Sequence, residues 1–329
     1  MKDADLVGAL PEAIATRIVS ARRGTGPAGG VATVVLDVAG LDERARGQIE
    51  QAARDLVGAA PGVSEVRVAM TAQKRARRIL AIGSGKGGVG KSTLAANLAI
   101  ALARGQGGRS GLKVGLVDAD IYGPSQPTIF GVTGTRPEAR GDKLVPVDTP
   151  AGVPLLSMGQ LIGPGKAIAW RGPMTAGALS QLIDADWGET ELLVVDMPPG
   201  TGDVQLTMIQ KHKPIGAVLI STPQDLALID AARAGQLFES MTVPIVGLVE
   251  NMAGYACPHC GEVSDPFGAG GVEAAAERLG LPFLGRIPLA LAIRESGDAG
   301  RPPAATQGAE AEPFRAIATK VAEWLAAHA

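Results

Sequence analysis

The residues of this chain most able to do chemistry lie in one glycine-rich segment, GSGKGGVGKST, at positions 83–93. Within it, Gly85, Gly90, Lys91 and Ser92 fit the pattern G-x-x-x-x-G-K-[ST]. Glycines leave backbone N–H groups free to converge on phosphate oxygens, and a helix that begins directly after them adds the positive end of its dipole. The lysine neutralises the β- and γ-phosphates, and the hydroxyl after it can ligate Mg²⁺. The spacing predicts a site for a nucleoside triphosphate and magnesium.

The same loop carries a second lysine, Lys86, directly after its first glycine. Its long side chain can point toward its own nucleotide or away from it, toward a partner subunit. We expect both lysines of the loop to serve catalysis. The predicted nucleotide-binding residues of the loop are Gly85, Lys86, Gly87, Gly88, Val89, Gly90, Lys91, Ser92 and Thr93.

Two further apolar runs end in aspartates. The segment LVVDMPPGTGD places Asp196 at the end of a buried strand, the usual position of a Walker-B aspartate that holds Mg²⁺ through water. The segment GLVDADIYGPS places Asp118 and Asp120 at the end of another, and Asp120 is the better candidate to orient or deprotonate an attacking water. A solvent-facing turn aspartate is the alternative interpretation. We predict Ser92, Asp120 and Asp196 as magnesium ligands, and Lys86, Lys91 and Asp120 as catalytic residues.

These side chains need strands and helices to position them. Apolar runs of strand length alternate with helical patterns after position 79, and their Val/Ile/Leu density suits strands covered on both faces. The predicted strands are residues 79–82, 113–117, 153–157, 191–195, 217–221, 245–249 and 283–287, and the predicted helices are 92–103, 175–183, 226–240, 272–279 and 312–327. The alternation predicts an α/β fold with a doubly wound, mostly parallel sheet that binds ligands at the carboxyl ends of its strands.

A smaller unit precedes this domain. Residues 1–70 predict a small α/β domain with a helical stretch through Ile18, a strand at 31–38, a helix at 42–57 and a strand at 63–68. The basic run QKRARR follows, and we interpret residues 71–78 as a solvated basic linker rather than a contact for nucleic acid. Residues 79–329 then form the P-loop domain. Its last helix carries only Arg315 and Lys320 as basic residues, which favours packing on the sheet over binding to a membrane surface.

Composition narrows the class of protein. The 329 residues include 31 basic and 33 acidic ones, so the net charge of −2 implies no general attraction to nucleic acid or membrane. Aromatic residues make up 3%, which argues against platforms for base stacking. Charges interrupt the N-terminus, and the chain has no apolar run of about 18 residues, so we expect a cytoplasmic protein. Two cysteines are too few for a disulfide framework.

Six segments in order resemble the Mrp/ApbC group of P-loop ATPases, which are iron–sulfur cluster carriers related to MinD and ParA. They are GKGGVGKST, DADIYGPSQP, WRGPM at 170–174, VVDMPPGTGD, STPQDLALID and LVENMAGYACPHC. The resemblance covers about residues 74–328. It implies a homodimer with nucleotides near the interface, in which Lys86 reaches the partner's ATP. It also implies that Asn251 reads the adenine edge and that the loops around Asp120 and Gly200 sense the γ-phosphate.

The pair Cys257 and Cys260, in the segment CPHC, offers two thiolates. Such a pair can be a dithiol/disulfide redox couple or half of a zinc site. A tetrahedral zinc or a [4Fe–4S] cluster typically has four ligands, and the chain has no second pair of cysteines. A two-fold axis between two copies would supply four thiolates. We therefore favour a cluster that bridges two subunits, in agreement with the family resemblance, and keep zinc and a redox couple as alternatives. His259 is interpreted as a spacer between the cysteines.

Taken together, the residues and the resemblance predict an ATPase that hydrolyses Mg²⁺-ATP slowly, binds a [4Fe–4S] cluster across a homodimer and delivers it to apo iron–sulfur proteins. One alternative is a positioning or scaffold ATPase of the MinD/ParA kind, which has no use for Cys257 and Cys260; another is a small-molecule kinase on the same fold. Residues 1–70 resemble the small domain often fused in front of Mrp-type ATPases. Gly40 and Leu41 stand where that domain commonly carries Cys-Pro, so we expect no cluster site there.

Overall fold

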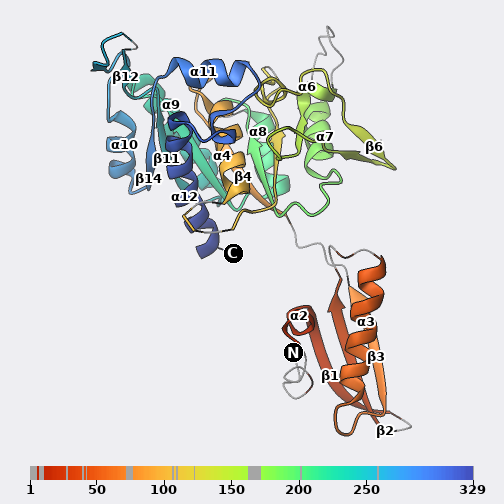
Figure 1. Ribbon diagram of the computed structural model, residues 1–329. Helices are drawn as coiled ribbons and strands as arrows, with labels where there is room; N and C mark the ends of the chain where they lie inside the picture. The colour runs from red at the N-terminus through yellow and green to blue at the C-terminus, as the bar shows by residue number, and fades with distance from the viewer. Residues whose placement is uncertain are drawn as a thin grey trace. The chain divides into compact units, whose positions relative to one another are not determined.

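The computed structural model describes residues 6, 11–26, 29–38, 41, 43–71, 77–105, 107–108, 110–121, 123–161, 172–200, 202–257 and 259–328. Trp170 and Arg171 of the segment WRGPM, Lys74 and Arg75 of the basic run, and Gly40 lie outside these residues. The chain divides into two compact units, residues 1–76 and 77–329. Figure 1 shows the elements of each unit, which are described here one at a time.

The first unit is a three-stranded sheet with a helix packed on it. The strands β1 (Ile18–Gly26) and β2 (Gly29–Asp37) form an antiparallel hairpin, and β3 (Glu65–Thr71) pairs in parallel with β2 after the crossover helix α3 (Glu43–Gly58). One face of β2 is fully buried through Ala32, Val34 and Leu36, which form a core cluster with Ala53 and Val57 of α3. This unit therefore has a hydrophobic core of its own.

The prediction of a helical stretch through Ile18 is wrong. The helix α2 (Glu12–Ala15) ends earlier, and β1 begins at Ile18 itself. Pairing with β2 explains the difference, because Ala21 lies opposite Val34 and so joins the buried face of the sheet. At the other end of the unit, β3 extends to Thr71 and β4 begins at Arg78, so both ends of the segment interpreted as a linker belong to strands.

The second unit is built on a seven-stranded sheet, in the order β14-β11-β10-β4-β9-β5-β8, in which every neighbouring pair is parallel. Its strands are β4 (Arg78–Gly83), β5 (Val114–Asp118), β8 (Leu155–Ser157), β9 (Leu192–Asp196), β10 (Gly216–Ser221), β11 (Ile245–Asn251) and β14 (Phe283–Ile287). All seven correspond to predicted apolar runs, and the α/β fold with a mostly parallel sheet is confirmed.

Helices cover both faces of this sheet. They are α4 (Lys91–Arg104), α5 (Gln126–Ile129), α6 (Met158–Leu161), α7 (Gly172–Ile183), α8 (Asp203–His212), α9 (Asp225–Ser240), α10 (Gly271–Leu279), α11 (Leu291–Asp298) and α12 (Glu312–Ala327). Alternate residues of β4 enter different clusters: Leu80 and Ile82 pack with α4 and α12, whereas Ile79 and Ala81 pack with α7, α8, α9 and α10. Strands with two buried faces explain why these segments read as continuous apolar runs.

The last helix, α12, packs on the sheet as predicted. Its residues Phe314, Ile317, Val321 and Leu325 are buried in the same cluster as α4. Two short antiparallel ribbons complete the unit, β6 (Glu138–Arg140) with β7 (Lys143–Val145), and β12 (Tyr255–Ala256) with β13 (Val263–Ser264). Short 3₁₀ turns cover Pro303–Ala305 and Ala309–Ala311.

Candidate functional site

The glycine loop joins β4, a central strand of the sheet, to the start of α4. Gly90 takes a left-handed conformation at the N-cap of α4, with φ of 87°. A Cβ at this position would lie 2.1 Å from Nδ2 of Asn251, so both the backbone conformation and the available space require glycine. The strand, loop and helix therefore have the arrangement that a phosphate-binding loop needs.

Asn251 lies against this loop. It is the last residue of β11, and its Nδ2 donates a hydrogen bond to the carbonyl oxygen of Val89 at 2.8 Å. The contact joins residues that are 162 positions apart in the sequence. The residue that the resemblance implicates in adenine recognition is thus next to the predicted nucleotide loop.

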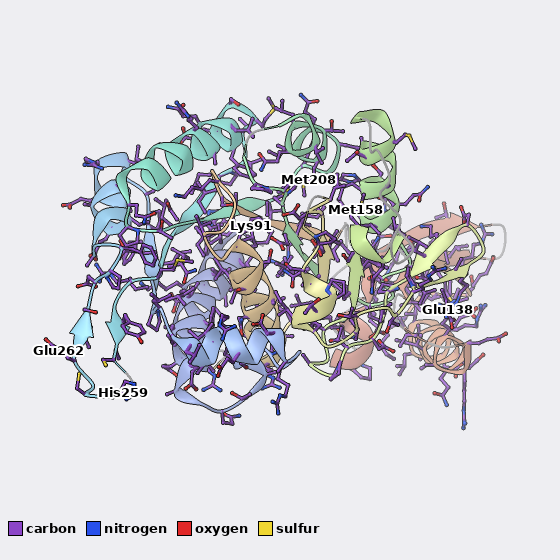
Figure 2. All side chains as sticks on the ribbon, turned by 90° about the horizontal axis from the view of Figure 1, so that it is seen from above. Lys91, Glu138, Met158, Met208, His259 and Glu262 are labelled. Carbon is purple, nitrogen blue, oxygen red and sulfur yellow. The ribbon has the colours of Figure 1, made fainter. Side chains whose placement is uncertain are left out.

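Three strand ends meet beside the loop. In the parallel register, Asp196 of β9 lies between Ile82 of β4 and Asp118 of β5, and Asp118 in turn lies opposite Ser157 of β8. Lys91, labelled in Figure 2, makes a buried ion pair with Oδ1 of Asp196. A single row across the sheet therefore carries the predicted Walker-B aspartate and the carboxylate of the neighbouring strand.

Lys91 also faces the second predicted carboxylate of the site. Its Nζ lies 3.9 Å from Oδ2 of Asp120, whose Oδ1 accepts a hydrogen bond from the backbone N–H of Gly123 at 3.2 Å. Ser92 is half-buried in the first turn of α4. Hydroxyl and carboxylate oxygens are the protein ligands that Mg²⁺ takes, and the ammonium beside Asp196 shows that a positive charge is stable at this position. The residues present fit a magnesium–nucleotide site.

Asp118 is the buried carboxyl of this row. It accepts hydrogen bonds from the Ser157 hydroxyl at 2.9 Å and from the backbone N–H groups of Asp120 and Gln126 at 3.2 Å each. Complete burial, together with the negative charge of Asp196, nevertheless raises the pKa of Asp118 to about 8. Asp118 therefore anchors the loop after β5, while Asp120 points its carboxylate toward Lys91.

Gln126 and Ser157 are polar site residues that the sequence analysis did not identify. The Gln126 side chain contacts Asp196 and Ser92, and Ser157 contacts Asp118. Gln126 lies inside the segment DADIYGPSQP, which was the available signal. Its role was not evident, because its partners lie 34 and 70 positions away in the sequence.

The loop after Asp196 also contacts the nucleotide loop. The backbone N–H of Gly200 donates to the carbonyl oxygen of Ser84 at 3.1 Å, and the Ser84 hydroxyl donates to the carbonyl oxygen of Lys86 at 3.0 Å. The Lys86 side chain is half-buried and makes no ion pair with any residue that the structure describes. The structure therefore brings Lys91, Asp120 and Asp196 together and leaves Lys86 outside that cluster.

Cys257 and Cys260 lie at the tip of the β12–β13 ribbon. Cys257 is half-buried and Cys260 is exposed, and both are free thiols. The backbone N–H of Cys257 donates to the carbonyl oxygen of Glu262, and that of Gly261 donates to the carbonyl oxygen of Cys257, each at 2.9 Å. This ribbon projects from the side of the unit, at the label β12 in Figure 1 and at the labelled residues His259 and Glu262 in Figure 2. The ribbon that carries the pair thus points away from the body of its own unit.

The surroundings of Cys257 favour the thiolate. Hydrogen bonds from the backbone of Cys260 and His259 and from the Cys260 side chain lower the pKa of the Cys257 thiol below its ordinary value. The thiolate is the form that ligates metals. Among the residues that the structure describes, no group of three or more His, Cys, Asp or Glu side chains is arranged to hold a metal ion. Cys257 and Cys260 together present two thiol groups.

Comparison with known proteins agrees with the family resemblance of the sequence. The ParA family model described as "NUBPL iron-transfer P-loop NTPase" matches residues 75–322, which is most of the chain. The chain belongs to this family. The match includes the glycine loop, the aspartates at the ends of β5 and β9, and both cysteines. The predicted family resemblance is therefore confirmed.

Individual relatives of this chain support the assignment to the family. An iron–sulfur cluster carrier protein of Pseudomonas fragi is 49% identical over 231 residues, which cover 69% of this chain and 78% of the relative. A nucleotide-binding protein of Archaeoglobus fulgidus, solved in complex with ADP, is 36% identical with a TM-score of 0.61, over 72% of this chain and 91% of that one. The cell division ATPase MinD of Pyrococcus furiosus shares the fold at 24% identity and a TM-score of 0.55, over 75% of this chain and 99% of MinD. No helix in the described part of the chain has the length and hydropathy that a membrane-spanning segment requires.

Proposed function

We propose that this protein is a Mg²⁺-dependent ATPase that binds a [4Fe–4S] cluster between two copies of the chain and delivers it to apo iron–sulfur proteins. The observation that carries the proposal is the position of Cys257 and Cys260 at the tip of a projecting ribbon in a chain of the iron-transfer NTPase family. Relatives of the chain are named iron–sulfur cluster carrier proteins, which supports an iron–sulfur cluster as the cargo.

The cluster is shared because each chain supplies only part of its ligands. A [4Fe–4S] cluster is typically held by four thiolates, and this chain has two cysteines in all. An isologous two-fold interface places the same ribbon of each subunit opposite its copy and so brings four thiolates together. The lowered pKa of Cys257 favours its ligand form, and the exposure of Cys260 leaves its sulfur accessible to a partner.

Binding and hydrolysis of ATP at the nucleotide site provide the free energy for changes in the dimer. We assign residues 85–93 to the phosphates, Asn251 to the adenine, and Ser92, Asp120 and Asp196 to magnesium, which neutralises phosphate charge when bound. Asp120 orients the attacking water, and Lys86, which makes no ion pair with the described residues of its own chain, reaches the nucleotide of the partner. The contacts of Gly200 with Ser84 and of Gly123 with Asp120 allow both loops to respond to the γ-phosphate. Slow hydrolysis then changes the arrangement of the dimer and its affinity for the cluster.

This assignment also leads to proposed roles for the remaining parts of the chain. The sequence predicts a division of the chain into residues 1–70, 71–78 and 79–329; with Thr71 in β3 and Arg78 in β4, we propose the part through β3 as a docking or regulatory domain and the part from β4 onward as the ATPase and carrier. We place the protein in the cytoplasm, where a reducing environment keeps the cysteines as thiols.

The experiment that tests the proposal compares the parent protein with its cysteine variants. The absorbance of the iron–sulfur cluster is measured after anaerobic incubation with iron and sulfide. The parent protein is expected to become coloured, and Cys257→Ala and Cys260→Ala are expected to lose the cluster while still binding ATP. Ser264→Ala is the matched control, because Ser264 is exposed on the same ribbon and offers no thiolate. A colourless parent, or a Cys257→Ala variant with the full cluster content of the parent, would overturn the proposal.

A further inference from the structure

Gln126 links three parts of the nucleotide site. It is the first residue of α5 and is fully buried, and its backbone N–H donates to Oδ2 of Asp118 at 3.2 Å. Its side-chain Nε2 donates to two acceptors, the carbonyl oxygen of Ser92 at 2.9 Å and Oδ2 of Asp196 at 2.8 Å. Both acceptors belong to residues assigned above to magnesium. One residue therefore joins three elements: its side-chain amide contacts the start of α4 and the end of β9, and its backbone N–H contacts the end of β5.

The partners determine which way this amide faces. The Ser92 carbonyl and the Asp196 carboxylate can only accept hydrogen bonds, so the NH₂ group must face them. The reversed amide would place its oxygen against two other oxygens. The orientation leaves Oε1 buried, and it has no hydrogen-bond partner in the part of the chain that the structure describes. An unpaired buried acceptor is unfavourable, because it has lost water and gained no donor.

We propose that Gln126 is a positioning residue of the metal–nucleotide site, and this inference rests on the proposed binding of Mg²⁺ by Ser92 and Asp196. Nε2 holds the Asp196 carboxylate in place, and Oε1 accepts a hydrogen bond from a water that enters with the metal. Lys91 now contacts the other oxygen of Asp196. When nucleotide phosphates draw Lys91 away, the Gln126 amide continues to orient the carboxylate. Metal-bound waters are strong donors, and magnesium retains several of them in protein sites.

The test measures metal binding rather than turnover. Mn²⁺ replaces Mg²⁺ as a paramagnetic probe, and its affinity for the ADP complex is measured by electron paramagnetic resonance in the full chain. Gln126→Met keeps the length of the side chain without its polar groups, and Gln126→Asn withdraws the amide by one methylene. Gln160→Met is the matched control, because Gln160 is also a buried glutamine with an unpaired amide atom, and it contacts the backbone of Ser157 instead of Ser92 or Asp196. ADP affinity in EDTA reports whether the nucleotide loop is intact.

We expect the affinity for Mn²⁺ to fall about tenfold or more in both Gln126 variants. This is the effect expected when one hydrogen bond to a charged group is lost. ADP affinity in EDTA should stay within about twofold of the parent, and Gln160→Met should bind Mn²⁺ as the parent does. Parental Mn²⁺ affinity in a Gln126 variant that binds ADP would overturn the inference. Loss of ADP binding in EDTA by both variants would also overturn it, since the role of Gln126 would then be structural. If the parent binds no Mn²⁺–ADP, the proposed function itself fails.

Discussion

The buried ion pair between Lys91 and Asp196 leads to a prediction about stability that is independent of nucleotide. We consider Lys91→Met, which keeps most of the side-chain volume and removes the ammonium group that contacts Asp196. Lys91 is 6% exposed and Asp196 is fully buried, so the substitution leaves a buried carboxylate without its cation. Active-site substitutions often leave stability unchanged or raise it, because catalytic residues are rarely optimal for folding. Here we expect the opposite.

The magnitude follows from what remains around Asp196. Removal of one partner of a buried ion pair typically costs about 3–5 kcal/mol. Gln126 still donates to Oδ2 of Asp196, whereas the neighbouring Asp118 adds no positive charge. We therefore expect the lower end of the range, about 3 kcal/mol, in the free energy of unfolding. For a domain of this size that loss corresponds to a fall in Tm of about 6–12 °C.

The assay is thermal and urea unfolding of the nucleotide-free protein in EDTA. Lys91→Met, Asp196→Asn and the double variant form a double-mutant cycle with the parent. The double variant should recover at least half of the stability lost in Lys91→Met, because it no longer contains an unpaired buried carboxylate. A Lys91→Met protein within about 0.5 kcal/mol of the parent would refute the reasoning.

Three other substitutions test separate parts of the account. Lys86→Ala should lower ATP hydrolysis more than ATP binding, compared by turnover and nucleotide titration, and unchanged hydrolysis would remove Lys86 from the site. Asp120→Asn should bind ATP and cleave it more slowly, and normal turnover would assign the orientation of water to another residue. Burial lowers the pKa of His212 from its ordinary 6.5, so the unfolded chain binds the proton first as pH falls. Stability should therefore decrease as the solution is acidified below about pH 6.5, and His212→Gln should reduce this slope; equal slopes in urea unfolding would contradict the burial of a neutral His212.

The sheet could be predicted because its strands are buried on both faces. Leu192 to Val195, for example, are all fully buried, and such a run has one plausible structure when helices flank it. The convergence of Asp118, Asp120 and Asp196 followed from the same reasoning, since parallel strands end at one edge of the sheet.

Other features depend on contacts that no local pattern shows. The strand β1 contains Arg22, Arg23 and Gly24, which interrupt any apolar alternation, and it exists because β2 pairs with it. The helix α5 has four residues, too few for a periodic pattern. Gln126 is indistinguishable in sequence from a surface glutamine until the fold brings Ser92 and Asp196 to its amide.

The central claim is that two copies of the chain share one cluster through Cys257 and Cys260. Native mass spectrometry of the anaerobically reconstituted protein tests it directly, because the mass gives the number of chains and the inorganic content together. The account predicts a species of two chains with a single [4Fe–4S] cluster, absent from Cys257→Ala. A cluster bound to a single chain, or dimers that contain zinc and no iron after reconstitution, would contradict it.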